Sequence, residues 1–523
     1  MVEFLNNNNS GFNQWNANKN AKTKSGGLGG FFWWLLIFLA SWWLLSSWLN
    51  PNSKKVTVDE TNAVAPVVDL SGVPQQTIES DKINANLQGL RISNVKLSEF
   101  ADGKSDDVVT LISGDGAYIE VGLTPTGTTA PDVKTKWTKN KDGYTWRNKD
   151  GVVFNRVTTI NDYVITITDK ITNNSNRDFG FAPYTKIVRA NDMKSSAGVY
   201  TGSVAYANNK LEHKDWVSFD KKSYAYSTTN GFAGFVDQYW ETVASIDSPD
   251  QTMRIKKAGD LYNADITAGQ VSIAPGKTES ITTNIYVGPR DNTILKSVEN
   301  VIPGIKKSID YGWFWFLAQP MVWALNGLNA FVGNYGVAII LLTLLIRLLM
   351  WPLTRKSYTS MMDMQKLQPE MQRIQKLYAN DKQRQQIEIA RLYQTHKTSP
   401  MSGCLPMLIQ LPIFFALYKA LLVSIQMRNA NFLWIHDLSA MDPYFILPIL
   451  MGLTMWLQQI LQTPQSKTSD KNDVTAQTQK VMKWMPLLFT LMFVWMPAGL
   501  VLYWTVSNIF GIGQMYFIKK NTK

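Results

Sequence analysis

Windows of about 20 apolar residues with few or no charged side chains recur along this chain. A helix of that length matches the hydrocarbon thickness of a bilayer, so the pattern predicts an integral membrane protein. The Lys and Arg residues cluster beside these windows, where such residues set the orientation of membrane helices. The net charge of +12 is therefore not interpreted as a nucleic-acid-binding surface.

Six apolar segments are predicted to span the membrane, and the linkers between them fix their direction. The spans cover residues 28–49, 335–354, 404–426, 444–462, 482–497 and 499–518. Linker 355–399 carries nine Lys or Arg residues and four acids, whereas linker 427–443 carries only Arg428. By the positive-inside rule, 355–399, 463–481 and the tail 519–523 are cytoplasmic, and 427–443 lies on the outer side.

The N-terminal region is predicted to be a disordered cytoplasmic tail, residues 1–27, followed by the first span. The tail is rich in Asn, Gly and Lys, and the lysines next to the span place it in the cytoplasm. Lys54 and Lys55 on the other side of the span oppose this orientation. The span is interpreted as an uncleaved anchor, and a cleaved signal peptide stays open as the alternative.

Between the first and second spans, residues 56–305 are predicted to form one large all-β sandwich on the outer side. Apolar and polar residues alternate in "GAYIEVGL" (116–123), "YVITITDKI" (163–171) and "SITTNIYVG" (280–288). Residues 310–332 follow, rich in aromatic side chains and without Lys or Arg. They are predicted to form an amphipathic helix in the outer interface, with a true span as the alternative.

Arg347 lies within the second span, although none of the six spans contains Asp or Glu. Because a permanent cation is costly in hydrocarbon, we expect it to face a water-holding groove. Thr343 lies one turn earlier on the same face. Snorkelling to the cytoplasmic surface is the alternative. Other spans offer uncharged polar groups that could line the groove or simply join helices: Gln410, Gln458, Tyr503, Asn508 and Gln514.

The cytoplasmic linker is predicted to contain a charged helical hairpin, residues 357–397. Apolar residues recur there at spacings of three and four, Pro369 should kink the first helix, and Asn380 should cap the second. Met361, Met362, Met364 and Met371 form a soft contact surface suited to varied partners. Packing of these methionines within the hairpin is the alternative.

Five motifs in order, "LLTLLIRLLMWPLT", "YTSMMDMQKLQPEMQ", "GCLPMLIQLPIFFALY", "LWIHDLSAMDPYFILPILMG" and "MPAGLVLYWTVSN", resemble the YidC membrane protein insertase family. The resemblance implies a five-helix insertase core and a periplasmic β-supersandwich with the architecture of sugar mutarotases. It implies a function without covalent catalysis: inserting and folding proteins of the bacterial inner membrane, alone or with the Sec translocon.

The resemblance also implies a site and partners. Arg347 and Thr343 correspond to the family's groove, and Tyr503, followed by Trp504, to its substrate-contacting position in the last span. The implied partners are nascent membrane proteins, ribosome–nascent chain complexes, the Sec translocon (SecYEG and SecDF) and the phospholipid bilayer. No cofactor or metal is implied. The tail "KKNTK" is short, so the hairpin is expected to carry more of the ribosome contact.

One departure and two rival functions stay open. Lys419 lies inside the third span, where it would add a second groove charge or snorkel outward to the level of Arg428. An anion transporter would explain a fixed positive charge, but we find no duplicated halves. A membrane-anchored carbohydrate enzyme would use carboxylates of the β domain such as Asp237 and Glu241.

Overall fold

The computed structural model describes residues 68–101, 107–113, 116–141, 143–190, 199–220, 222–396, 398, 405–462 and 474–521. The predicted tail 1–27, the first span 28–49 and residues 463–473 of the predicted linker 463–481 lie outside these residues. Residues 68–462 and 487–521 belong to one compact unit, and residues 474–486 belong to another.

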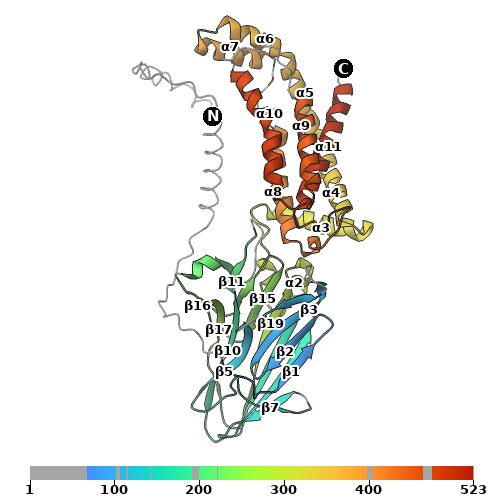
Figure 1. Cartoon of the computed structure of the whole chain (residues 1–523). Coiled ribbons are helices and arrows are strands. Elements are labelled where there is room, and N and C mark those ends of the chain that lie inside the picture. The colour runs from blue at the N-terminus through green and yellow to red at the C-terminus, as the bar shows by residue number, and fades with distance from the viewer. Residues whose placement is uncertain are drawn as a thin grey trace, which may run out of the picture. The chain divides into compact units, whose positions relative to one another are not determined.

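The β domain consists of two antiparallel sheets, and so confirms the all-β sandwich that alternation predicted (Figure 1). The first sheet contains β1 (Gln75–Glu79), β2 (Ile83–Gln88), β3 (Arg91–Ala101), β4 (Val108–Leu111), β5 (Tyr118–Thr126), β10 (Phe179–Ala190), β13 (Tyr224–Thr228), β16 (Gln251–Ala258), β17 (Leu261–Thr267) and β18 (Val271–Ile273). The second contains β6 (Thr138–Lys139), β7 (Tyr144–Arg147), β8 (Val152–Asn161), β9 (Val164–Asn173), β11 (Gly202–Ala207), β12 (Lys210–Asp215), β14 (Phe232–Val236), β15 (Trp240–Ile246) and β19 (Thr278–Pro289).

The core lies between the two sheets because alternate side chains of each strand point inward. In β9 the inward positions include Ile165 and Ile167, both almost fully buried. Across the interface, the rings of Phe154 on β8 and Phe181 on β10 meet edge to face, with centroids 5.4 Å apart. A short 3-10 helix, Trp216–Asp220, follows β12.

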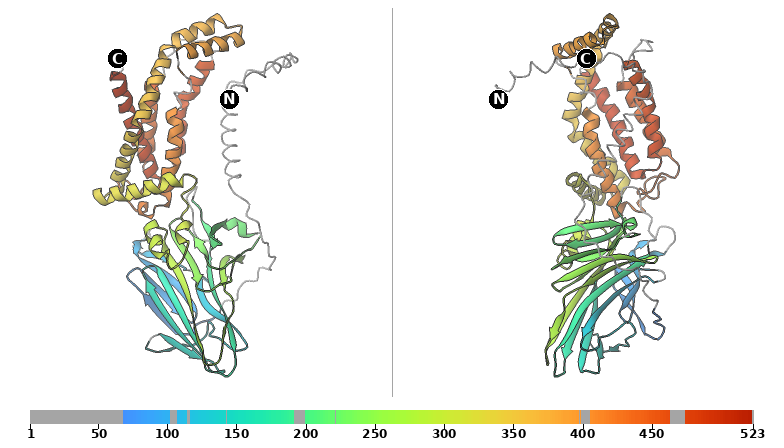
Figure 2. Two further views of the ribbon diagram at one scale, coloured as in Figure 1. Left: turned by 180° about the vertical axis from the view of Figure 1, so that it is seen from behind. Right: turned by 90° about the vertical axis from the view of Figure 1, so that its left-hand side faces the viewer.

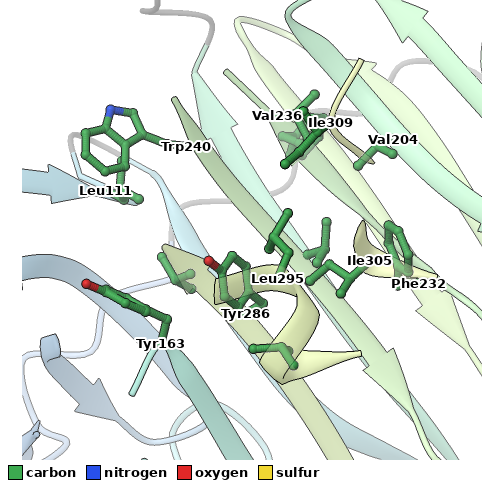
Figure 3. Close-up of a cluster of buried hydrophobic side chains, with 14 of the residues drawn as sticks. Leu111, Tyr163, Val204, Phe232, Val236, Trp240, Tyr286, Leu295, Ile305 and Ile309 are labelled. Atoms are coloured by element: carbon green, nitrogen blue, oxygen red, sulfur yellow. The ribbon is translucent and has the colours of Figure 1, made fainter. Parts of the chain in front are cut away.

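A short helical segment closes one end of the second sheet. Helix α2 (Asn292–Val298) begins where Asp291 accepts hydrogen bonds from the amides of Thr293 and Ile294. A 3-10 turn, η2 (Ile305–Ser308), follows it. Leu295 and Ile305 from this segment are fully buried and point toward Tyr286 and Phe232 of the sheet (Figure 3).

The remaining described chain is helical (Figures 1 and 2). Its elements are α3 (Trp315–Val332), α4 (Tyr335–Leu349), α5 (Trp351–Lys366), α6 (Gln368–Leu377), α7 (Lys382–Thr395), α8 (Leu405–Val423), η4 (Ile425–Met427), α9 (Ile446–Gln462), α10 (Val474–Phe493) and α11 (Ala498–Asn521). Helix α11 packs against α4, α5, α8 and α9, and α3 packs against α4 and α8.

Among the described residues, no single helix is both long and apolar enough to pass as a membrane span. Helices α4 and α5 pass together, but they are bent by 63° at Met350. Shorter apolar stretches are Ile409–Val423, Ile446–Leu461 and Trp484–Phe493. The predicted continuous span 335–354 is thus a bent pair, because Pro352 in the first turn of α5 has no amide hydrogen for a bond back to α4.

Several helix boundaries differ from those predicted. Helix α10 begins at Val474, inside the stretch 463–481 that was predicted to be a linker. In the hairpin, the predicted interruption at Pro369 is present: α5 and α6 are separated at Leu367, because Pro369 occupies the first turn of α6. The cap of α7 is Asp381 rather than Asn380, and its carboxylate accepts from the amide of Arg384 at 3.0 Å.

Helix α3 has two apolar faces. Ala318, Met321 and Leu325 are buried on one face. Trp323 and Phe331 on another are 80% and 90% exposed. A helix that is apolar on both faces needs an apolar environment beyond the protein itself.

Candidate functional site

The guanidinium of Arg347, on α4, is held by a hydroxyl of α11. Its Nε and Nη2 atoms donate to Oγ of Ser507 at 2.8 and 2.5 Å. Among the described residues no carboxylate lies within ion-pair distance of Arg347. The cation therefore has a neutral acceptor, and its net charge is not cancelled by the partner.

Two small residues of α11 make room for this cation. Ser507 follows Tyr503 by one turn, and Gly511 follows Ser507 by another, so the three lie along one face. A Cβ atom at Gly511 would lie 3.8 Å from Nη1 of Arg347 and 3.4 Å from Nε2 of Gln458. Sequence reasoning missed Ser507 and Gly511, although their positions four and eight residues after Tyr503 were a usable signal.

Thr343 and Tyr503, both predicted groove residues, are buried. Thr343 is fully buried and donates to the carbonyl of Ile339 in its own helix at 2.7 Å. The hydroxyl of Tyr503, a residue only 1% exposed, accepts a hydrogen bond from Nε2 of Gln410 on α8. We call Thr343, Arg347, Gln410, Tyr503 and Ser507 the polar cluster.

Three further predicted groove residues do not hydrogen-bond to the cluster. Asn508 donates to the carbonyl of Met451 at 3.4 Å and to Oγ1 of Thr454 at 3.3 Å, and so joins α11 to α9. Trp504 lies in an aromatic group, with its ring 5.0 Å from that of Phe414. Gln514 is 2% exposed, and its amide has no hydrogen-bond partner within the described residues.

Lys419 on α8 is held in an ion pair. Its Nζ lies 2.9 Å from Oδ2 of Asp310, in the segment that precedes α3. Burial raises the pKa of Asp310, but the charge of Lys419, its hydrogen bond and the hydrogen bond from the Gly312 amide together outweigh burial and hold the pKa below its usual value. Neither predicted role for Lys419, a second groove charge or snorkelling to the level of Arg428, included this partner.

The methionines of the predicted hairpin surface contact other parts of the chain, and only some of these contacts lie within the hairpin. Met361 and Met362 pack against Tyr358, Met515 and Ile518. Further along the hairpin, the sulfur of Met371 accepts from the hydroxyl of Tyr393 at 3.2 Å and joins α6 to α7. Met364 is half-buried.

The β-domain carboxylates that a carbohydrate enzyme would need are buried in a structural network. Asp237 pairs with Arg189 at 2.8 Å, and Glu241 accepts from Oγ of Ser308 at 2.6 Å. Both carboxylates are at most 3% exposed. Burial raises the pKa of Glu241 to about 7, partly offset by the neighbouring Arg290. Such groups have no access to a sugar. The described residues hold no group of side chains suited to a metal ion.

Comparison with known proteins places this chain. Residues 75–324 match the family model for the YidC periplasmic domain, and residues 327–523 match that for the 60Kd inner membrane protein. The membrane protein insertase YidC of Magnetococcus marinus is 34% identical over 500 residues, which cover 87% of this chain and 88% of that protein. The chain belongs to the YidC family of membrane protein insertases.

A second curated relative gives the same assignment. The membrane protein insertase YidC of Methylobacillus flagellatus is 38% identical over 392 residues, which cover 72% of this chain and 68% of that protein. A solved structure of an active YidC insertase with its first transmembrane domain resolved is 20% identical and has a TM-score of 0.38. That likeness covers 85% of this chain and 95% of the solved one.

Proposed function

We propose that the polar cluster lines a hydrophilic groove through which the chain takes up the polar flank of a client membrane protein. Family membership makes the chain an inner-membrane insertase with a periplasmic β domain, acting without covalent catalysis. One observation carries the finer proposal: Arg347 is permanently charged, and its partner Ser507 is neutral. A transient anion from a client can therefore pair with it.

The mechanism follows from the cost of moving polar groups through hydrocarbon. Acidic residues in the client's flank are attracted to Arg347, and the groove shortens the apolar barrier that the flank must cross. The client's apolar segment then leaves sideways into lipid past Tyr503 and Trp504. Since Tyr503 is buried and bonded to Gln410, this step requires α8 to separate from α11.

The proposed topology has six membrane spans, the last five forming the insertase core, with both termini in the cytoplasm. The exposed aromatic face of α3 lies in the outer interface, where Trp is favoured. The hairpin of α6 and α7 lies in the cytoplasm and contacts ribosome–nascent chain complexes. SecYEG and SecDF are the proposed partners for clients that need the Sec translocon.

Site-specific photocrosslinking tests the groove. A photoreactive residue replaces Tyr503 in membranes that carry ribosomes stalled on a short inner-membrane protein. The control is the same replacement at Tyr516, a 72% exposed tyrosine of the same helix. A crosslink from position 503 to the client's apolar segment, appearing only at certain chain lengths, is expected. Equal crosslinking from both positions, or none from position 503, would contradict the proposed exit path.

A further inference from the structure

A cavity of about 440 Å³ lies where the chain leaves the β domain and enters α3. Three parts of the chain form its wall: His213 from β12, Asn292 from α2, and the segment from Lys306 to Gln319. Its volume is within the range of sites that hold small molecules, roughly 300–1,000 Å³. None of its residues belongs to the polar cluster, so the proposed insertion path leaves this cavity without a role.

The charges on the wall favour an anion. The ammonium of Lys307 donates to the hydroxyl of Tyr206 at 3.0 Å, and that of Lys306 lies 3.5 Å from Glu299. An ammonium has more N–H donors than these single contacts use. The wall's carboxylate, Asp310, is already paired with Lys419. Among the residues that the structure describes, Lys307 therefore has no carboxylate partner at the cavity, and Lys306 adds a second donor.

Uncharged hydrogen-bonding groups stand beside the two lysines. His213 lines the cavity, but its Nε2 atom is buried away from the open space and is not counted among the groups that meet a ligand. Burial, with the charge of Arg290, lowers the pKa of His213 to about 4, so the ring is neutral at pH 7. Asn292 and Gln319 contribute amides. Ammonium groups combined with neutral donors suit a phosphate, whose oxygens accept several hydrogen bonds at once.

The mouth of the cavity adjoins an apolar surface. Trp315 lines the cavity and is 57% exposed, and it begins the helix whose Phe316, Trp323 and Phe331 are also exposed. A ligand with a phosphate and an apolar tail would fill the cavity and cover this face together. A free phosphate would leave the aromatic side chains in water.

We infer that the cavity binds the phosphodiester headgroup of a phospholipid, whose acyl chains lie along the exposed face of α3. The inference rests on the proposed placement of α3 in the outer interface. The bound lipid would fix the depth of α3 in the bilayer. It would also fix the position of residues 306–314, which connect the β domain to α3.

The test uses the full chain in nanodiscs of phosphatidylethanolamine and phosphatidylglycerol with a trace of phospholipid that carries a photoactivatable headgroup. Labelled peptides are mapped by mass spectrometry, and the label is expected within residues 292–319. The double substitution Lys306→Glu and Lys307→Glu should lower this labelling by about tenfold. The matched control, Lys277→Glu and Lys296→Glu, reverses two exposed lysines of the same domain that do not line the cavity, and should leave the labelling unchanged.

Two further labelling experiments use the unsubstituted chain, so they test the inference even if the double variant misfolds. Equal labelling by a photoactivatable glycolipid without phosphate would overturn the inference. Binding of inorganic phosphate at the cavity without any headgroup labelling would assign the site to a free anion and overturn it as well. A second probe, activated in the acyl chain, should label α3. Acyl labelling without headgroup labelling defeats only the lipid site, whereas the absence of both also defeats the interfacial placement of α3.

Discussion

Removing the Ser507 hydroxyl should loosen the contact between α4 and α11. One oxygen of Ser507 accepts two N–H groups of Arg347. Hydrogen bonds to charged groups contribute about 1.5–3 kcal/mol in soluble proteins. Couplings measured between membrane helices average about 0.6 kcal/mol and reach about 1.7 kcal/mol. With a charged donor and an acceptor that is 2% exposed, we expect a coupling near the upper end, about 1.5 kcal/mol.

A double-mutant cycle with Ser507→Ala and Arg347→Gln measures this coupling. Steric trapping gives the free energy of separating α11 from α4 and α5, with biotin labels on cysteines introduced at Lys356 of α5 and Lys519 of α11, both exposed and outside the proposed spans. The single native cysteine, Cys404, is first replaced by serine. The readout is local, so it does not depend on unfolding of the β domain.

The control is Thr505→Val in the same cycle. Thr505 is a buried hydroxyl of the same helix, and it donates to the carbonyl of Val501 at 2.8 Å rather than contacting Arg347. Its coupling to Arg347→Gln should be close to zero. A coupling for Ser507 below about 0.3 kcal/mol, which is within the error of additivity, would refute the assignment of Ser507 as the partner of the cation.

Three further outcomes are expected. Gly511→Leu should reduce insertion of acidic-flanked clients several-fold by filling the space beside the guanidinium, whereas Gly513→Leu, at an open position, should not. The pKa of Glu241 is about 7 in the native state against an ordinary 4.5, so the native state binds this proton more tightly than the unfolded state does. The melting temperature of the β domain should therefore fall as the pH rises from 4.5 through 7. Glu241→Gln should remove that fall. Lys419→Met should destabilise the chain by about 1 kcal/mol in chemical unfolding, given the partial exposure of the pair, and adding Asp310→Asn should recover most of it.

Local patterns in the sequence predicted the β domain well. The alternating stretch 163–171 corresponds to β9, and 280–288 corresponds to β19. Alternation reports which face of a strand is buried, and this is a property of neighbouring residues. It does not report which strands pair, because pairs such as β10 with β5 join residues that are far apart in the chain. The sheet order was therefore beyond prediction from the sequence.

The site was predicted in part, and for a similar reason. An Arg in an apolar stretch without acids is visible in the sequence, and so is the threonine one turn before it. Which side chain of α11 reaches Arg347 depends on the rotation of that helix, and packing against α4 and α9 fixes the rotation. Ser507 carries no charge and looks like an ordinary helix residue. The pairing of Lys419 with Asp310 joins positions 109 residues apart, which no local pattern reveals.

The neutrality of Ser507 is itself a functional property. Suppose that Ser507→Asp put a carboxylate about 4 Å from the guanidinium. At an effective dielectric constant of 20 the pair would gain about 4 kcal/mol. A client carboxylate would have to displace that partner, and the cation would no longer attract it. A neutral hydroxyl holds Arg347 in place and leaves its field available. We therefore expect Ser507→Asp to stabilise the contact between α4 and α11 in steric trapping while it slows insertion of acidic-flanked clients more than Ser507→Ala does. Equal insertion by the two variants would show that the client never senses the charge of Arg347.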